Sequence, residues 1–189
     1  MQPHRTSSPS LLVVSRRVAA IRDELVSGWT TWIAGRQAGS PALDGATSQR
    51  MVRLIVDLLV VMAGPMRREA ADTWHAATDL YGKLAALRGL SAGEVVEELQ
   101  HLRELLALQL GDFFVALPSR QQMPTVLRIN RLIDSAVTNA VVSYTDALVA
   151  SMFSKEGVPV PTADSFQEAI EQIGSIEADV RLLAERSPR

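Results

Sequence analysis

The chain has 189 residues, of which 47% are hydrophobic, and its formal net charge is −2 at pH 7. This composition excludes a disordered chain, and the lack of a basic stripe argues against nucleic acid as the main partner. The sequence contains no cysteine, which excludes disulfides, thiolate metal sites and cysteine nucleophiles. Its most apolar run, residues 54–66, contains Asp57 and is shorter than the roughly 20 residues that a membrane span needs. We therefore expect a cytoplasmic protein that makes no membrane contact.

Apolar residues recur at intervals of three and four through most of the chain, which places them on one face of a helix. No stretch shows the alternation of apolar and polar residues that is typical of a β-strand. Six helices joined by short connections are therefore expected, and they favour an all-α antiparallel bundle. These helices are predicted at residues 8–33, 47–63, 65–88, 91–117, 125–153 and 162–189.

Several helix ends are marked by residues that prefer such positions. Ser91 and Glu94 have the spacing of a capping box at the start of the fourth helix. Gly89 suits the left-handed position that ends the third helix, and Pro65 is expected to open that helix. Gly28 is expected to end or bend the first helix.

The fourth and fifth helices are expected to form a hairpin. From Ala107 onward the fourth helix is apolar nearly all round, so its second half is expected to be buried. A short polar turn at residues 118–124 leads to the fifth helix, so the two helices should run antiparallel and touch. Arg103 is then predicted to face Asn130 and Asp134, because a guanidinium group can bind a carboxylate through two bonds.

The chain is expected to consist of a flexible tail (1–8), a helical bundle domain (9–155), a hinge that contains prolines (156–161) and a C-terminal amphipathic helix (162–189). Because the hinge is extended, the last helix is expected to be separable from the bundle. Its narrow apolar stripe must be covered either by the bundle or by a second copy, and the latter arrangement predicts a homodimer. The stripe consists of Phe166, Ile170, Ile173, Ile176, Val180 and Leu183.

Two carboxylate-x-x-histidine spacings form the strongest enzyme-like pattern. Residues three apart share a helix face, so each pair could offer two ligands to one metal ion, as in dimetal carboxylate bundles. Such a site needs more carboxylates from other helices, and the sequence offers only isolated candidates. The alternative interpretation places both pairs on solvated faces. The pairs are Asp72 with His75 and Glu98 with His101, and the isolated candidates are Asp57 and Asp134.

Two further interpretations concern one histidine and the aromatic side chains. His101 has acidic neighbours at helical spacing and could accept a phosphoryl group, but a kinase-type His-Glu or His-Asp pair is absent from the sequence. Six aromatic residues could line a small-molecule pocket, although large aromatics at helical spacing are more often core residues. They are Trp29, Trp32, Trp74, Phe113, Phe114 and Tyr144.

Residues 74–148 contain short motifs that are typical of a bacterial signalling module. They are Tyr81-Gly82-Lys83, Gly89-Leu90-Ser91, Val95 to Glu98 followed by Leu99, Leu102 and Arg103, and Asn130 followed by Asp134, Ala136, Val137 and Tyr144. Together they resemble the N-terminal domain of the RsbT co-antagonist family, which is also found ahead of some sensor histidine kinases. Tyr81 replaces the usual histidine of that pattern, Ala85 the usual arginine, and Leu99 a common aromatic residue.

This resemblance implies an all-helical input domain that senses or docks and catalyses no reaction. It implies a place in the general stress response or in kinase control, with a signalling kinase or STAS-type protein as partner and with no cofactor. Structural or interaction roles are implied for Glu98, Arg103, Asn130 and Asp134. We expect the chain to be only the sensory or docking part of such a system. The rival interpretations are a metal-carboxylate bundle enzyme and a helical regulator that binds a small molecule.

Overall fold

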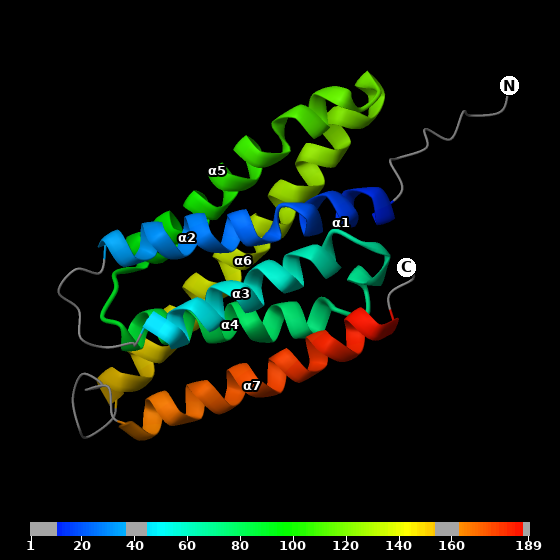
Figure 1. Ribbon diagram of the computed structural model, residues 1–189. Helices are drawn as coiled ribbons and strands as arrows, with labels where there is room; N and C mark the ends of the chain where they lie inside the picture. Colours follow the sequence, from blue (N-terminus) through cyan, green and yellow to red (C-terminus); the bar gives the residue numbers. More distant parts are fainter. Residues whose placement is uncertain (1–10, 37–44, 154–162, 187–189) are drawn as a thin grey trace, which may run out of the picture.

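The computed structural model describes residues 11–36, 45–153 and 163–186, and all regular structure within them is helical (Figure 1). The prediction of an all-α bundle is therefore confirmed. The expected tail at 1–8 and hinge at 156–161 lie outside the described residues. The elements are α1 (Leu11–Ala20), α2 (Arg22–Arg36), α3 (Gly45–Met62), the 3-10 turn η1 (Pro65–Arg67), α4 (Ala71–Leu87), α5 (Ala92–Ala116), α6 (Ser119–Phe153) and α7 (Ala163–Arg186).

The first predicted helix is divided into α1 and α2 at Ile21. The backbone N–H of Ile21 donates to the carbonyl of Val18 at 3.2 Å, which is a tighter turn than the α-helix makes. The prediction that Gly28 ends or bends this helix is wrong, because Gly28 lies within α2. A Cβ at this position would contact methyl carbons of Leu105 at 3.4 Å, so α2 lies close to α5 here.

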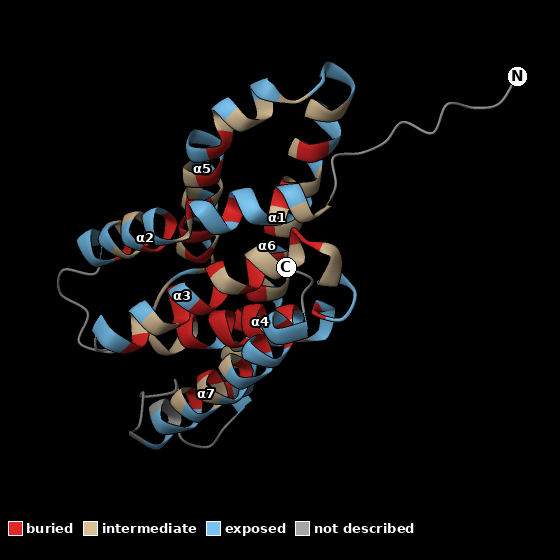
Figure 2. Ribbon diagram, turned by 45° about the vertical axis from the view of Figure 1, so that its right-hand side comes forward, coloured by how far each residue is buried: buried red, intermediate tan, exposed pale blue. Residues whose placement is uncertain are grey.

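The centre of the molecule is formed by α3 and α4. Figure 1 shows these helices side by side, with α1 and α2 on one side and α7 on the other. Because α3 packs against α1, α2, α4 and α7, its apolar residues are buried on more than one face (Figure 2). Pro65 opens the 3-10 turn rather than α4, which begins at Ala71. The most deeply buried residues of α3 are Val52, Leu54, Ile55, Val56, Leu58 and Leu59.

The apolar stripe of α7 is covered by the body of the same chain. α7 packs against both α3 and α4, and Arg50 of α3 binds Glu177 of α7 through two hydrogen bonds of 3.2 and 2.9 Å. The expectation that this stripe forms a dimer surface is therefore wrong, since the apolar face of α7 is already used. Ile170 is half-buried, and the side chain of Phe166 lies outside the described residues. The buried members of the stripe are Ile173, Ile176, Val180 and Leu183.

The connection between α4 and α5 has the predicted geometry. The hydroxyl of Ser91 accepts the backbone N–H of Glu94 at 3.3 Å, and the Glu94 carboxylate accepts the backbone N–H of Ser91 at 2.7 Å. Gly89 has a φ of 72°, the left-handed conformation that only glycine adopts readily. The predicted capping box and helix end are both confirmed.

The hairpin of α5 and α6 departs from the predictions beyond Ala107. Its tip projects from the bundle (Figure 2), and we call residues 107–127 the arm. Leu108 is 78% exposed and Val115 is 77% exposed, so the expectation that the second half of α5 is buried is wrong. The predicted turn at 118–124 is wrong as well, because α6 already begins at Ser119 and contains Pro124.

α4 and α6 pack closely against each other. Gly82 of α4 is buried there, and a Cβ on it would overlap the carbonyl oxygen of Ala140 on α6. The missing side chain therefore allows the backbones of the two helices to approach closely. Trp74 and Thr78 of α4 add hydrogen bonds to this interface, to Ser135 at 3.0 Å and from Asn139 at 3.1 Å.

Replacing Gly82 by alanine should destabilise the protein by about 1–3 kcal/mol or more, because the overlap is with backbone that cannot rotate away. The matched control is Gly111→Ala in α5, where a Cβ would have no neighbour within 4 Å. That change should stabilise the protein by about 0.5–1 kcal/mol, the ordinary gain from removing a helical glycine. Denaturant unfolding monitored by circular dichroism measures both effects, and equal effects of the two changes would contradict the close contact.

Candidate functional site

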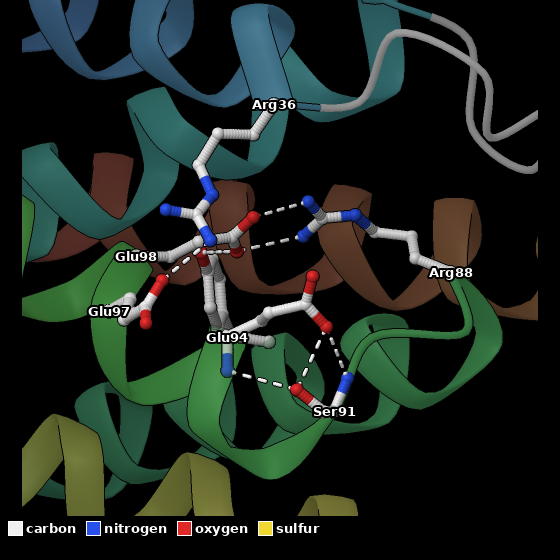
Figure 3. A network of polar contacts seen from close by, with 7 residues as sticks. Arg36, Arg88, Ser91, Glu94, Glu97 and Glu98 are labelled. Atoms are coloured by element: carbon white, nitrogen blue, oxygen red, sulfur yellow. Dashed lines mark hydrogen bonds and ion pairs between the residues drawn. The ribbon is translucent and has the colours of Figure 1, made fainter.

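A buried carboxylate lies at the junction of α4 and α5. Glu98 is only 2% exposed, and Arg88 binds both of its oxygens, with Nη1 at 2.9 Å from Oε2 and Nη2 at 2.5 Å from Oε1 (Figure 3). The hydroxyl of Tyr81 donates to Oε2 at 2.5 Å. One carboxylate is thus held by three donor atoms from α4 and the residue that follows it, which fixes α4 against the start of α5.

Burial and the charge of Glu98 together set the protonation of Tyr81 and Arg88. The pKa of Tyr81 is raised well above the ordinary tyrosine value, first by burial and then by the charge of Glu98. For Arg88, burial acts to lower the pKa, but the hydrogen bonds and charge of Glu98 raise it above the ordinary value. Arg88 therefore remains a cation and Tyr81 remains a neutral donor. A charged pair of this kind is stable in the interior because all its partners are present together.

Outer contacts join this cluster to α2. Trp29 of α2 stacks on Tyr81, with ring centroids 5.8 Å apart and planes 22° from parallel. Arg36, in the last turn of α2, binds Glu97 at 2.5 Å at the surface (Figure 3). The polar cluster of Tyr81, Arg88 and Glu98 thus has aromatic packing on one side and a surface ion pair on the other.

The predicted ion pair between Arg103 and Asp134 is present. Nη2 of Arg103 lies 2.5 Å from Oδ1 of Asp134, and the two side chains are 35% and 59% exposed. Within the described part of the chain, Asn130 forms no hydrogen bond with either residue, so a direct bond is present for Asp134 alone. Asn130 instead lines a cleft together with Arg103.

That cleft lies between α5 and α6 at the base of the arm. Its volume is about 280 Å³, and its walls include Leu106, Phe114 and Ile129. Small-molecule sites in proteins usually occupy about 300–1,000 Å³, so this cleft is at the lower limit. A smaller cavity of about 20 Å³ lies beside Tyr81 and Arg88 and has room for little more than one water molecule.

The proposed metal ligands are not brought together. Glu98 is bound to Arg88, Asp57 is bound by Arg22 through two hydrogen bonds, and Asp134 is bound by Arg103. Across residues 11–36, 45–153 and 163–186, no group of three or more histidines and carboxylates is arranged to hold a metal ion. Two further candidates, Asp72 and His75, are exposed on α4.

His101 and the aromatic residues are spread over several environments. The ring of His101 stacks on Trp32 with centroids 4.5 Å apart, and its Nδ1 lies 3.3 Å from Glu104. Trp74 donates to Ser135, and Tyr144 donates to the carbonyl of Leu90 at 2.6 Å. The six aromatic residues therefore do not line one common pocket, and of them Phe114 borders the cleft between α5 and α6.

Sequence reasoning missed Arg88 and the role of Tyr81. The available signal was the position of Glu98, which lies three residues after Val95 and four before Leu102, both on the buried face of α5. A carboxylate that falls within a row of buried apolar residues needs a cationic partner. Arg88, ten residues earlier in the chain, was the nearest candidate across the turn.

Comparison with known proteins finds no matching family model, no matching curated protein and no matching solved structure. Among the described residues, no helix has both the length and the apolar character needed to cross a membrane.

Replacing Tyr81 by phenylalanine should lower the free energy of unfolding at neutral pH by about 1–3 kcal/mol, since a hydrogen bond to a buried charged group is lost. The raised pKa of Tyr81 means that its contribution to stability is complete below the ordinary value of 10.0 and is lost as the pH rises above it. The difference between wild type and variant should therefore narrow above about pH 10. Denaturant unfolding across this range measures it, and a difference that stays constant would refute the assignment.

A double-mutant cycle of Arg103→Ala and Asp134→Ala should give a coupling energy of about 0.2–1 kcal/mol, the range for partly exposed ion pairs. The control cycle pairs Arg103→Ala with Asn130→Ala, which share the cleft without a hydrogen bond, and should give less coupling. Thermal or denaturant unfolding of the single and double variants supplies both values. A first cycle with no coupling above error would show that the ion pair contributes nothing to stability.

Proposed function

We propose that this chain is a non-enzymatic bacterial signalling domain that docks or senses through its helical surface. In this proposal it resembles the N-terminal domain of the RsbT co-antagonist family and acts in stress-response or kinase signalling. The observation that supports the proposal best is the exposed apolar face of α5 on the arm, where Leu108 is 78% and Val115 is 77% exposed.

The outer face of α5 has the character of a docking helix. Leu108 and Val115 lie seven residues apart and so share one side of the helix, together with Glu104 and Asp112. This side is opposite the buried row of Leu102, Leu106 and Leu110. An apolar stripe flanked by carboxylates suits an apolar groove with basic residues at its rim.

The residues that carry the family resemblance lie at the base of this arm. Glu98 fixes the start of α5 against α4, and the ion pair of Arg103 with Asp134 fastens α5 to α6. In this proposal they determine the direction in which the arm projects, and they do not contact the partner. Their roles are structural, as the resemblance implies for an input domain without chemistry.

The proposal is tested by binding assays with a STAS-domain protein and a signalling kinase of the stress-response type. The double variant Leu108→Glu/Val115→Glu should weaken binding at least about tenfold, because it places charge on the apolar stripe. The control is Leu182→Glu, which changes a 51% exposed leucine on α7 and should leave binding unchanged. No binding by the wild type, or equal loss in both variants, would refute the proposal.

A further inference from the structure

The outward face of α6 carries a continuous row of exposed residues. Ten positions follow one another at intervals of three or four, and every one of them is exposed. The row runs nearly the whole length of a 35-residue helix, which is about 50 Å long. It lies on the side away from the buried residues of α6, and its member Asp134 is also bound by Arg103 of α5. The row consists of Arg120, Met123, Leu127, Arg131, Asp134, Thr138, Val142, Thr145, Val149 and Met152.

This outer row is apolar towards both ends and polar in its middle. Met123 and Leu127 are 62% and 45% exposed near one end, and Val149 and Met152 are 44% and 75% exposed near the other. Single exposed apolar residues are ordinary, but several on one helix face form a patch that usually marks an interface. The intervals average about 3.5 residues, which is the spacing of helices that pair along their length.

The outer row is complementary to itself when a second helix runs antiparallel to it. If a two-fold axis passes beside Thr138, each residue faces the one at the same distance on the other side of that position. Leu127 then faces Val149 of the second copy. Met123 faces Phe153, which is 84% exposed. The second copy thus covers both apolar ends of the row at the same time. A parallel pairing at this register would also cover them.

The positions of the charged residues distinguish an antiparallel from a parallel pairing of the two α6 helices. In the antiparallel arrangement Arg131 faces Thr145 and lies beside the exposed Asp146 of the second copy, and this contact occurs twice. None of the ion pairs between described residues uses Arg131 or Asp146. In a parallel pairing Arg131 would instead face Arg131. Asp134 would likewise face Asp134, so the parallel direction brings like charges together and the antiparallel direction separates them.

We propose that the outer face of α6 binds the same face of a second copy, with the two helices antiparallel and the two-fold axis beside Thr138. The interface uses α6 and leaves the outer face of α5 free, so it does not depend on the signalling function. It also differs from the stripe of α7, which is buried within the chain.

Cross-linking tests the register, because the chain has no cysteine of its own. Thr138→Cys should form a disulfide-linked dimer under mild oxidation, since the two copies of position 138 lie next to the axis. Thr145→Cys is the matched control, the same change on the same row. Its two copies lie about 20 Å apart, beyond the roughly 7 Å limit between the Cα atoms of a disulfide. Cross-linking of both variants would show a parallel pairing, and cross-linking of neither would show that this face is not an interface; either result overturns the proposal.

Light scattering and sedimentation test the charge contact. The wild type should have twice the 20.6 kDa mass of one chain at micromolar concentration. Arg131→Glu should raise the dimer dissociation constant about tenfold or more, because like charges then meet twice. Arg131→Glu/Asp146→Arg should restore it. A monomeric wild type, or a double variant as weak as Arg131→Glu, overturns the antiparallel pairing.

Discussion

The buried carboxylate of Glu98 is the interaction on which the arrangement of α4, α5 and the arm depends. A carboxylate in the interior is unstable unless a counter-charge and hydrogen-bond donors reach it together. Arg88 can reach it because the chain reverses at Gly89, whose positive φ lets the turn close directly after α4. Tyr81 supplies the further donor and stacks on Trp29, so α2 is held to the same point. The starting direction of α5 is therefore fixed by one charge and its partners.

Arginine–carboxylate pairs also join four other pairs of helices among the described residues. Apolar faces alone would allow one helix to slide along another, whereas a guanidinium group bound to a carboxylate stabilises one register. We interpret these bridges as registry devices, which also explains why carboxylates that could have bound a metal are occupied by arginine. The bridges are Arg22 with Asp57 for α2 and α3, Arg36 with Glu97 for α2 and α5, Arg50 with Glu177 for α3 and α7, and Arg103 with Asp134 for α5 and α6.

Features governed by neighbouring residues could be predicted from the sequence. The cap at Ser91, the left-handed Gly89 and the apolar rows of the helices depend on spacing along one segment. The pairing of Arg103 with Asp134 followed from the short turn between two helices. The exposure of Leu108 could not be predicted, because an apolar helix face looks the same whether its own chain or a partner covers it. The break at Ile21 has no local signal, since neither glycine nor proline occurs there.

The close contact of Gly82 with Ala140 fixes one point of α6 against α4. Ala140 lies 21 residues from the first residue of α6 and 13 residues from the last, so the contact divides the helix into two segments of unequal length. A Cβ on Gly82 would overlap the carbonyl oxygen of Ala140, so backbone meets backbone here and α6 has no room to move closer to α4. A rotation of α6 about this contact would move the arm roughly one and a half times as far as the opposite end, given a constant rise per residue. A small displacement at the far end of α6 would thus be amplified at the tip of the arm, about 30 Å from this contact.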